Sequence, residues 1–124
     1  MHLIDIAGAI TAARHSRCPV VTAAVDGLQF LHPIKIGDLI ILKAHVTCVF
    51  TTSLEVQVEV FSEETLTGNR RMTSSAYLTF TTIATDGRRA TPPELIVETD
   101  DERRGCGEAQ IRRAARLKSR PPST

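Results

Sequence analysis

The first fifteen residues form an apolar segment in which Asp5 is the only charged side chain before Arg14. Apolar residues occur on every side of a helix drawn through this segment, which is typical of a helix enclosed by the rest of a protein. Three, four and seven positions after Asp5, on the same helix face, the sequence has Gly8, Ala9 and Ala12. Asp5 therefore stands on a strip of minimal side chains, where a backbone or a slim ligand can come close. An unpaired buried carboxylate is costly, so Asp5 requires a partner or a chemical role, although an acid in the first turn can also serve the helix dipole alone.

Four segments with strand character follow this helix, at residues 20–30, 39–50, 54–61 and 71–83. The third alternates most regularly, and it is predicted to point Leu54, Val56, Val58 and Val60 inward and Glu55, Gln57 and Glu59 outward. In the second segment, the residues predicted to share one face are Ile40, Leu42, Ala44, Val46, Cys48 and Phe50. A sheet must bury one face, and the apolar helix is its only apolar partner in the chain. The predicted fold class is therefore α+β, with a twisted antiparallel sheet wrapped around a central helix.

The last quarter of the chain differs, because charged residues replace the alternating pattern. Residues 1–97 are predicted to form the globular domain, and residues 98–124 a charged C-terminal helix and tail. Acidic residues come first in this helix and basic residues last, as the helix dipole prefers. Gly105 and Gly107 interrupt it at a cost of about 1 kcal/mol each relative to alanine. We therefore expect a frayed appendage with solvated arginines, whose removal after Ile96 costs little stability.

The composition of the chain argues against several classes of protein. The formal net charge is +1, aromatic residues make up 4% of the chain and tryptophan is absent, so the charge and stacking surfaces that a nucleic-acid partner needs are not expected. No apolar run is long enough to span a bilayer, so no membrane partner is expected. Cys18, Cys48 and Cys106 are widely spaced, which favours a reducing, cytoplasmic location over a disulfide framework or a zinc site. The sequence shows no metal-ligand cluster or nucleotide-binding loop, and no cofactor or metal is expected.

A series of short motifs extends in order over roughly residues 1–120. The motifs are Leu3-Ile4-Asp5, Ala12-Ala13-Arg14-His15, Val20-Val21-Thr22-Ala23, Gly37-Asp38, Thr52-Ser53-Leu54-Glu55-Val56, Leu66-Thr67-Gly68, and Asp86-Gly87 ahead of Pro92-Pro93. Each motif alone is weak, but together, at consistent spacing, they show that the chain resembles the hotdog-fold acyl-CoA thioesterases of the brain acyl-CoA hydrolase type. The resemblance implies hydrolysis of an acyl-CoA thioester to a free fatty acid and CoA, a reaction of lipid metabolism. It also implies a homodimer or a higher homo-oligomer, such as a trimer of dimers.

The same resemblance implies that Asp5 is the catalytic carboxylate, acting as a general base on water or as a nucleophile on the thioester. Backbone N–H groups around the helix N-terminus would meet the developing oxyanion. From the residues themselves, the hydroxyls of Thr52 and Ser53 are candidate contacts for CoA, with an equal case for turn residues that serve their own backbone. Arg71 is a candidate partner for a CoA phosphate, and a solvated surface charge is the alternative.

Members of that family have a first strand and a Gly-Gly turn just before the helix, whereas here Met1 stands four residues before Asp5. We therefore expect the 124-residue chain to be less stable and less active than a version extended through such a turn. Phe50 also replaces a glycine that is common in relatives. The alternative function is a catalytically impaired acyl-CoA-binding or assembly subunit of the same fold. A dehydratase or hydratase would require a histidine beside the acid, and His15 lies ten residues away along the helix.

Overall fold

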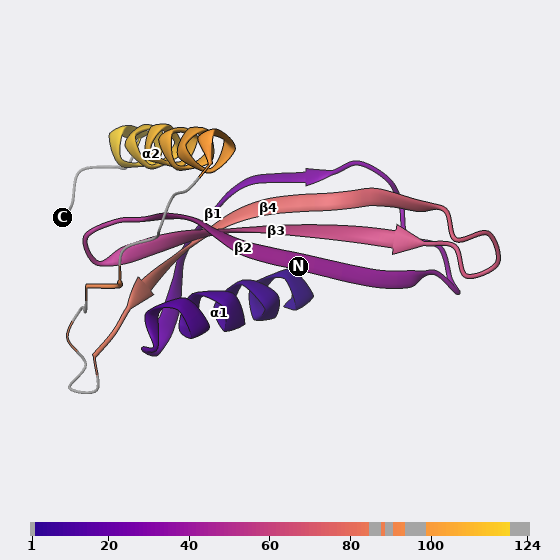
Figure 1. The fold of residues 1–124 in the computed structure, drawn as a ribbon, viewed down its shortest axis with the longest axis horizontal. Coiled ribbons are helices and arrows are strands. Elements are labelled where there is room, and N and C mark those ends of the chain that lie inside the picture. Colours follow the sequence, from indigo (N-terminus) through magenta and orange to yellow (C-terminus); the bar gives the residue numbers. More distant parts are fainter. Residues whose placement is uncertain (1, 85–87, 89–90, 94–98, 120–124) are drawn as a thin grey trace.

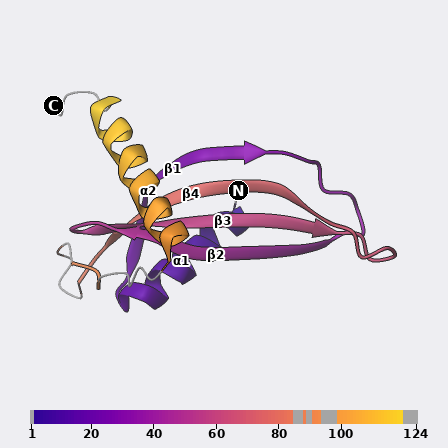
Figure 2. The ribbon, with the colours of Figure 1, turned by 45° about the horizontal axis from the view of Figure 1, so that its top comes forward.

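The computed structural model describes residues 2–84, 88, 91–93 and 99–119. Within them, the elements in chain order are α1 (His2–Ser16), β1 (Val20–Phe30), β2 (Leu39–Val49), β3 (Ser53–Glu63), β4 (Arg70–Thr82) and α2 (Asp100–Ser119). The strands form one antiparallel sheet in the order β1-β4-β3-β2. The two helices lie on opposite sides of this twisted sheet (Figures 1 and 2). The predicted α+β architecture of an antiparallel sheet packed on an apolar helix is confirmed. The predicted turn at Asp86-Gly87 and the predicted domain boundary after residue 97 lie outside the described residues.

The core lies between α1 and the face of the sheet that β3 and β4 dominate. Its buried side chains are Ile4 and Ala12 of α1, Leu54, Val56, Val58 and Val60 of β3, and Ala76, Leu78 and Phe80 of β4. The inward residues predicted for β3 are confirmed. The strip of small residues on α1 brings the helix close to the sheet, because Gly8 and Ala12 are buried against it.

Gly8 is a point of close contact between α1 and β4. A Cβ atom at this position would lie 3.0 Å from Cζ and 3.1 Å from Cε2 of Phe80, whose side chain is fully buried. In an open helix, alanine is better than glycine by about 1 kcal/mol. Here the buried ring cannot move freely, so we expect Gly8→Ala to destabilise the protein by about 1–2 kcal/mol, measured by urea unfolding. The matched control is Gly105→Ala in α2, where a Cβ atom would meet nothing within 4 Å and the free energy of unfolding should rise. A stabilised Gly8→Ala variant would contradict this packing.

A β-bulge in β2 corrects the predicted side of Cys48. The register between β2 and β3 shifts between Val46 and Cys48, and Cys48 pairs with Glu55. A bulge adds one residue to one strand and reverses the side on which the following side chains stand. Cys48 therefore lies on the α2 side of the sheet. The Phe50 ring lies on the same side, because the guanidinium of Arg113 in α2 is 5.1 Å from the centre of this ring. The prediction that both residues share the face of Ile40 and Leu42 is wrong.

The prediction of a frayed C-terminal appendage is also wrong. α2 continues through Gly105 and Gly107, and Ala109 is fully buried against the sheet. The helix presents Arg112, Arg113 and Arg116 to the sheet, whereas Ile111 remains 70% exposed. This orientation is the reverse of the usual amphipathic pattern, in which the apolar stripe faces the core.

Two ion pairs and one disulfide fasten α2 to the sheet, and we call these three contacts the α2 attachment. Arg112 binds Glu55 of β3 through both oxygens of the carboxylate, at 2.7 and 3.1 Å. Arg116 Nη1 lies 2.7 Å from Oδ2 of Asp26 in β1. A disulfide joins Cys106 to Cys48, which corrects the expectation of a chain without disulfides. Glu55 does point away from α1 as predicted, but it is only 1% exposed because α2 covers it.

Candidate active site

Asp5 stands in the first turn of α1, on the side of the helix that faces β1. Its side chain is half-buried, and its Oδ1 atom accepts a hydrogen bond of 2.9 Å from the hydroxyl of Thr22. Thr22 is an exposed residue of β1 and pairs with Phe80 of β4. The contact therefore holds the carboxylate in one orientation while the site remains open to solvent. The N–H groups in the first turn of a helix have no acceptor within that helix, so those of α1 are available beside the same carboxylate.

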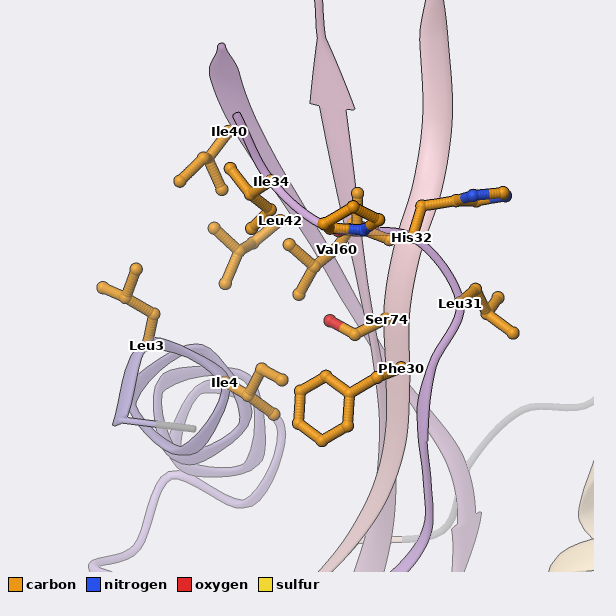
Figure 3. A pocket seen from close by; sticks show the side chains of 12 residues that line it. Leu3, Ile4, Phe30, Leu31, His32, Ile34, Ile40, Leu42, Val60 and Ser74 are labelled. Atoms are coloured by element: carbon orange, nitrogen blue, oxygen red, sulfur yellow. The ribbon is translucent and has the colours of Figure 1, made fainter. Parts of the chain in front are cut away.

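An apolar cavity of about 470 Å³ begins next to this turn, at Leu3 and Ile4. Figure 3 shows the Phe30 ring beside Ile4, with Leu42 and Val60 across the cavity and the Ser74 hydroxyl directed inward. The remaining wall comes from Leu31, His32, Pro33, Ile34, Ile40 and Thr73. Cavities that bind small molecules usually measure about 300–1,000 Å³ and have mainly apolar walls. Ile4 directly precedes Asp5, so the cavity and the carboxylate lie at the same turn of α1, although Asp5 itself is not part of the cavity wall.

The structure separates the three residues predicted to bind CoA. Thr52 lies in the turn between β2 and β3, and its carbonyl accepts hydrogen bonds from the backbone N–H and the hydroxyl of Thr82. Ser53 begins β3 and pairs with Thr81 of β4. On the other side of β4, Thr81 pairs with Val21 of β1. Two strand spacings amount to about 10 Å, so Ser53 lies at the same end of the sheet as the Asp5–Thr22 pair. Its side chain alternates with that of the buried Leu54, however, and stands on the α2 side of the sheet, as Glu55 does.

Arg71 lies at the opposite end of the sheet. It is an exposed residue at the start of β4 and pairs with Ser62 of β3. Ten positions along β4 separate it from Thr81, which corresponds to about 30 Å of extended strand. Within one subunit, the structure does not bring Arg71 together with Thr52 and Ser53.

His15 does not form a second catalytic group with Asp5. His15 Nε2 lies 2.9 Å from the carbonyl oxygen of Pro93, and ten helical residues place it about 15 Å along α1 from Asp5. This position agrees with the argument against a dehydratase. Among the described residues, no three side chains of the metal-binding types come together. No helix in the described part of the chain has the length and apolarity needed to cross a membrane.

Sequence reasoning missed Thr22 and the pairing of Glu55 with Arg112. Thr22 belongs to the motif at residues 20–23, but only the register of β1 shows that its hydroxyl reaches Asp5. The sequence does show a carboxylate at position 55 in the most regular strand and several arginines near the C-terminus. Neither feature specifies that Glu55 pairs with Arg112.

Comparison with known proteins identifies the family. Residues 1–69 match the model of the thioesterase superfamily. An uncharacterized acyl-CoA thioester hydrolase of Bacillus subtilis, YkhA, is 39% identical over 102 residues, which are 82% of this chain and 59% of the relative. The human cytosolic acyl coenzyme A thioester hydrolase is 31% identical over 114 residues, which are 90% of this chain and 30% of that protein. The chain thus spans about 59% and 30% of the length of these relatives.

Solved structures agree with the sequence matches. An apo-hexameric acyl-CoA thioesterase superposes with a TM-score of 0.88 at 34% identity, covering 94% of this chain and 75% of the other. The acyl-CoA hydrolase of Staphylococcus aureus, in complex with butyryl-CoA, CoA and CoA disulfide, superposes with a TM-score of 0.83 at 33% identity, covering 96% and 75%. The chain therefore belongs to the thioesterase superfamily and has its hotdog fold.

Proposed function

We propose that this chain hydrolyses acyl-CoA thioesters to a free carboxylic acid and CoA, with Asp5 as the catalytic carboxylate. The observation that carries the proposal is the hydrogen bond between Asp5 and Thr22, two residues 17 positions apart. Structures of the Staphylococcus aureus hydrolase include one variant with an aspartate replaced by alanine and another with a threonine replaced by alanine, and these two positions also differ by 17. The equal spacing supports the assignment of Asp5 and Thr22 to the same kind of site.

We propose that Asp5 acts as a general base, with nucleophilic attack on the thioester as the alternative. Because Thr22 donates to Oδ1 of Asp5, the second oxygen can accept a proton from a water molecule. The resulting hydroxide would attack the thioester carbonyl, and N–H groups of the first turn of α1 would stabilise the oxyanion. Collapse of the tetrahedral intermediate would release the CoA thiolate, which takes up a proton. The apolar cavity at Leu3 and Ile4 would hold the acyl chain.

The candidate CoA contacts fall into two groups, one within the subunit and one across subunits. Thr52 and Ser53 lie at the same end of the sheet as the Asp5–Thr22 pair, and CoA that extends past this end would contact them in the same subunit. Arg71 is too distant for that role and would meet a CoA phosphate only from a neighbouring subunit. A homo-oligomer is supported by the hexameric neighbour and by apolar side chains that α1 leaves exposed, namely Leu3, Ile6 and Ile10. A cytoplasmic location is supported by the human relative, which is named a cytosolic enzyme.

The test of the proposal is the release of free CoA thiol from acyl-CoA substrates of different chain lengths. We expect saturable turnover that is proportional to protein concentration. Saturable binding of CoA without turnover, by a folded protein, would contradict the proposal and support the non-catalytic alternative.

Thr22 offers a second measurement at the same site. We expect Thr22→Val, which keeps the shape but removes the hydroxyl, to lower kcat by about 10- to 100-fold, because the carboxylate loses its fixed orientation. Thr22→Ser keeps the donor and should retain most of kcat. If the valine variant is as active as the serine variant, the hydroxyl does not position Asp5.

A further inference from the structure

The α2 attachment combines two interactions of different chemistry. The ion pairs of Arg112 and Arg116 depend on charge, whereas the bond between Cys48 and Cys106 depends on the redox state. The bulge in β2 is what turns Cys48 toward α2, and the Cα atoms of the two cysteines lie 4.7 Å apart. The third cysteine, Cys18, is free. The cysteine pair thus joins two elements that no backbone pairing connects.

Disulfides in cytosolic proteins are usually transient or redox-sensing, because low-molecular-weight thiols keep most cysteines reduced. We propose that Cys48 and Cys106 form a site of reversible thiol–disulfide exchange with low-molecular-weight thiols of the glutathione class, and that its redox state determines how firmly α2 is held on the sheet. In the reduced protein the ion pairs and the other non-covalent contacts hold α2. In the oxidised protein a covalent bond closes the 58-residue separation between the two cysteines.

The burial of the two sulfurs determines the order of the steps. Cys48 is fully buried and Cys106 is half-buried, so an incoming reagent reaches Cys106 first. In oxidation, the Cys106 thiolate attacks a glutathione disulfide, which releases one glutathione thiolate and leaves a mixed disulfide on Cys106. The Cys48 thiolate then attacks the Cys106 sulfur and releases the second glutathione. Two protein thiols lose two electrons and two protons, and the glutathione disulfide becomes two thiols. An excess of glutathione reverses both steps.

The test equilibrates the folded chain in buffers of defined glutathione ratio and alkylates the free thiols for mass spectrometry. We expect one alkylated cysteine, Cys18, in the oxidising buffer and three in the reducing buffer. Reduction should lower Tm by roughly 10 °C, because it removes a constraint on a long loop of the unfolded chain. Cleavage by trypsin within α2, at Arg103 or Arg104, should accelerate in the reduced protein, because the covalent attachment of the helix is lost.

Two variants distinguish this exchange site from a general effect of oxidation. Cys106→Ser should behave as the reduced protein in both buffers, and Cys18→Ser should keep the full redox response. The proposal is overturned if Cys48 and Cys106 remain alkylatable in excess glutathione disulfide, or if excess glutathione cannot reduce the bond in the folded protein. It is also overturned if Tm and the rate of tryptic cleavage are the same in both redox states.

Discussion

Replacing Asp5 with asparagine is expected to reduce thioester hydrolysis to the limit of detection while the protein remains folded. Asparagine has the shape of aspartate, and its amide oxygen can still accept the hydrogen bond from Thr22. It cannot take a proton from water, and loss of a general base costs about 10²–10⁴ in rate. The measurement is kcat for CoA release, together with thermal unfolding of the same sample.

The control for this substitution is an aspartate that lies outside the proposed site. The side chain of Asp101 in α2 is 88% exposed. Among the described residues, its ion-pair partner is Arg104, at 3.3 Å. Asp101→Asn should leave kcat unchanged. If the folded Asp5→Asn variant retains most of kcat, the assignment of Asp5 as the catalytic carboxylate is wrong.

Replacing Arg112 with methionine is expected to destabilise the protein by about 3–5 kcal/mol, because the variant leaves the buried carboxylate of Glu55 without its cation. The Thr47 hydroxyl, which donates to Glu55 at 2.6 Å, would be the remaining side-chain donor. The loss includes the contact between the Arg112 guanidinium and the Tyr77 ring, whose centre is 3.6 Å away. The hydrogen bond with Glu55 raises the pKa of Arg112 above its ordinary value, so Arg112 is charged at every pH at which the fold would be assayed.

Urea unfolding measures this effect, and two further variants show its origin. Arg103→Met removes an arginine that pairs with the exposed Asp100, and it should change the free energy of unfolding by no more than about 1 kcal/mol. The double variant Glu55→Leu with Arg112→Met removes both charges and should recover much of the lost stability. An Arg112→Met variant within about 1 kcal/mol of the parent protein would show that Glu55 is not buried under α2.

The fold on the α1 side could be predicted because its features are local in the sequence. The helix follows from a nearly uncharged apolar segment, and β3 follows from a spacing of two residues between apolar side chains. The same rule failed after Val46, because one extra residue in β2 reverses the faces and leaves no mark in the alternation. It also failed for α2, where two glycines and few apolar residues predicted a frayed appendage, whereas arginines and a disulfide attach the helix to the sheet.

The candidate site was only half predictable for a related reason. Asp5 is conspicuous because a lone acid in an apolar helix has a high energetic cost. Its partner Thr22 is one of many threonines, and its role depends on where β1 places it relative to α1. Arg71 is the opposite case, because its residue type suits a phosphate but its position in β4 is far from Thr52 and Ser53.

The reversed orientation of α2 has a consequence for how its release would be observed. Denaturant m-values and the heat capacity change of unfolding both grow with the apolar surface that becomes exposed. The surface between α2 and the sheet combines guanidinium and carboxylate groups with the Phe50 and Tyr77 rings, the Cys48–Cys106 bond and the buried Ala109. The layer between α1 and the sheet is instead built from aliphatic and aromatic side chains. Detachment of α2 would therefore give a smaller calorimetric signal and a shallower denaturant slope than unfolding of the layer between α1 and the sheet.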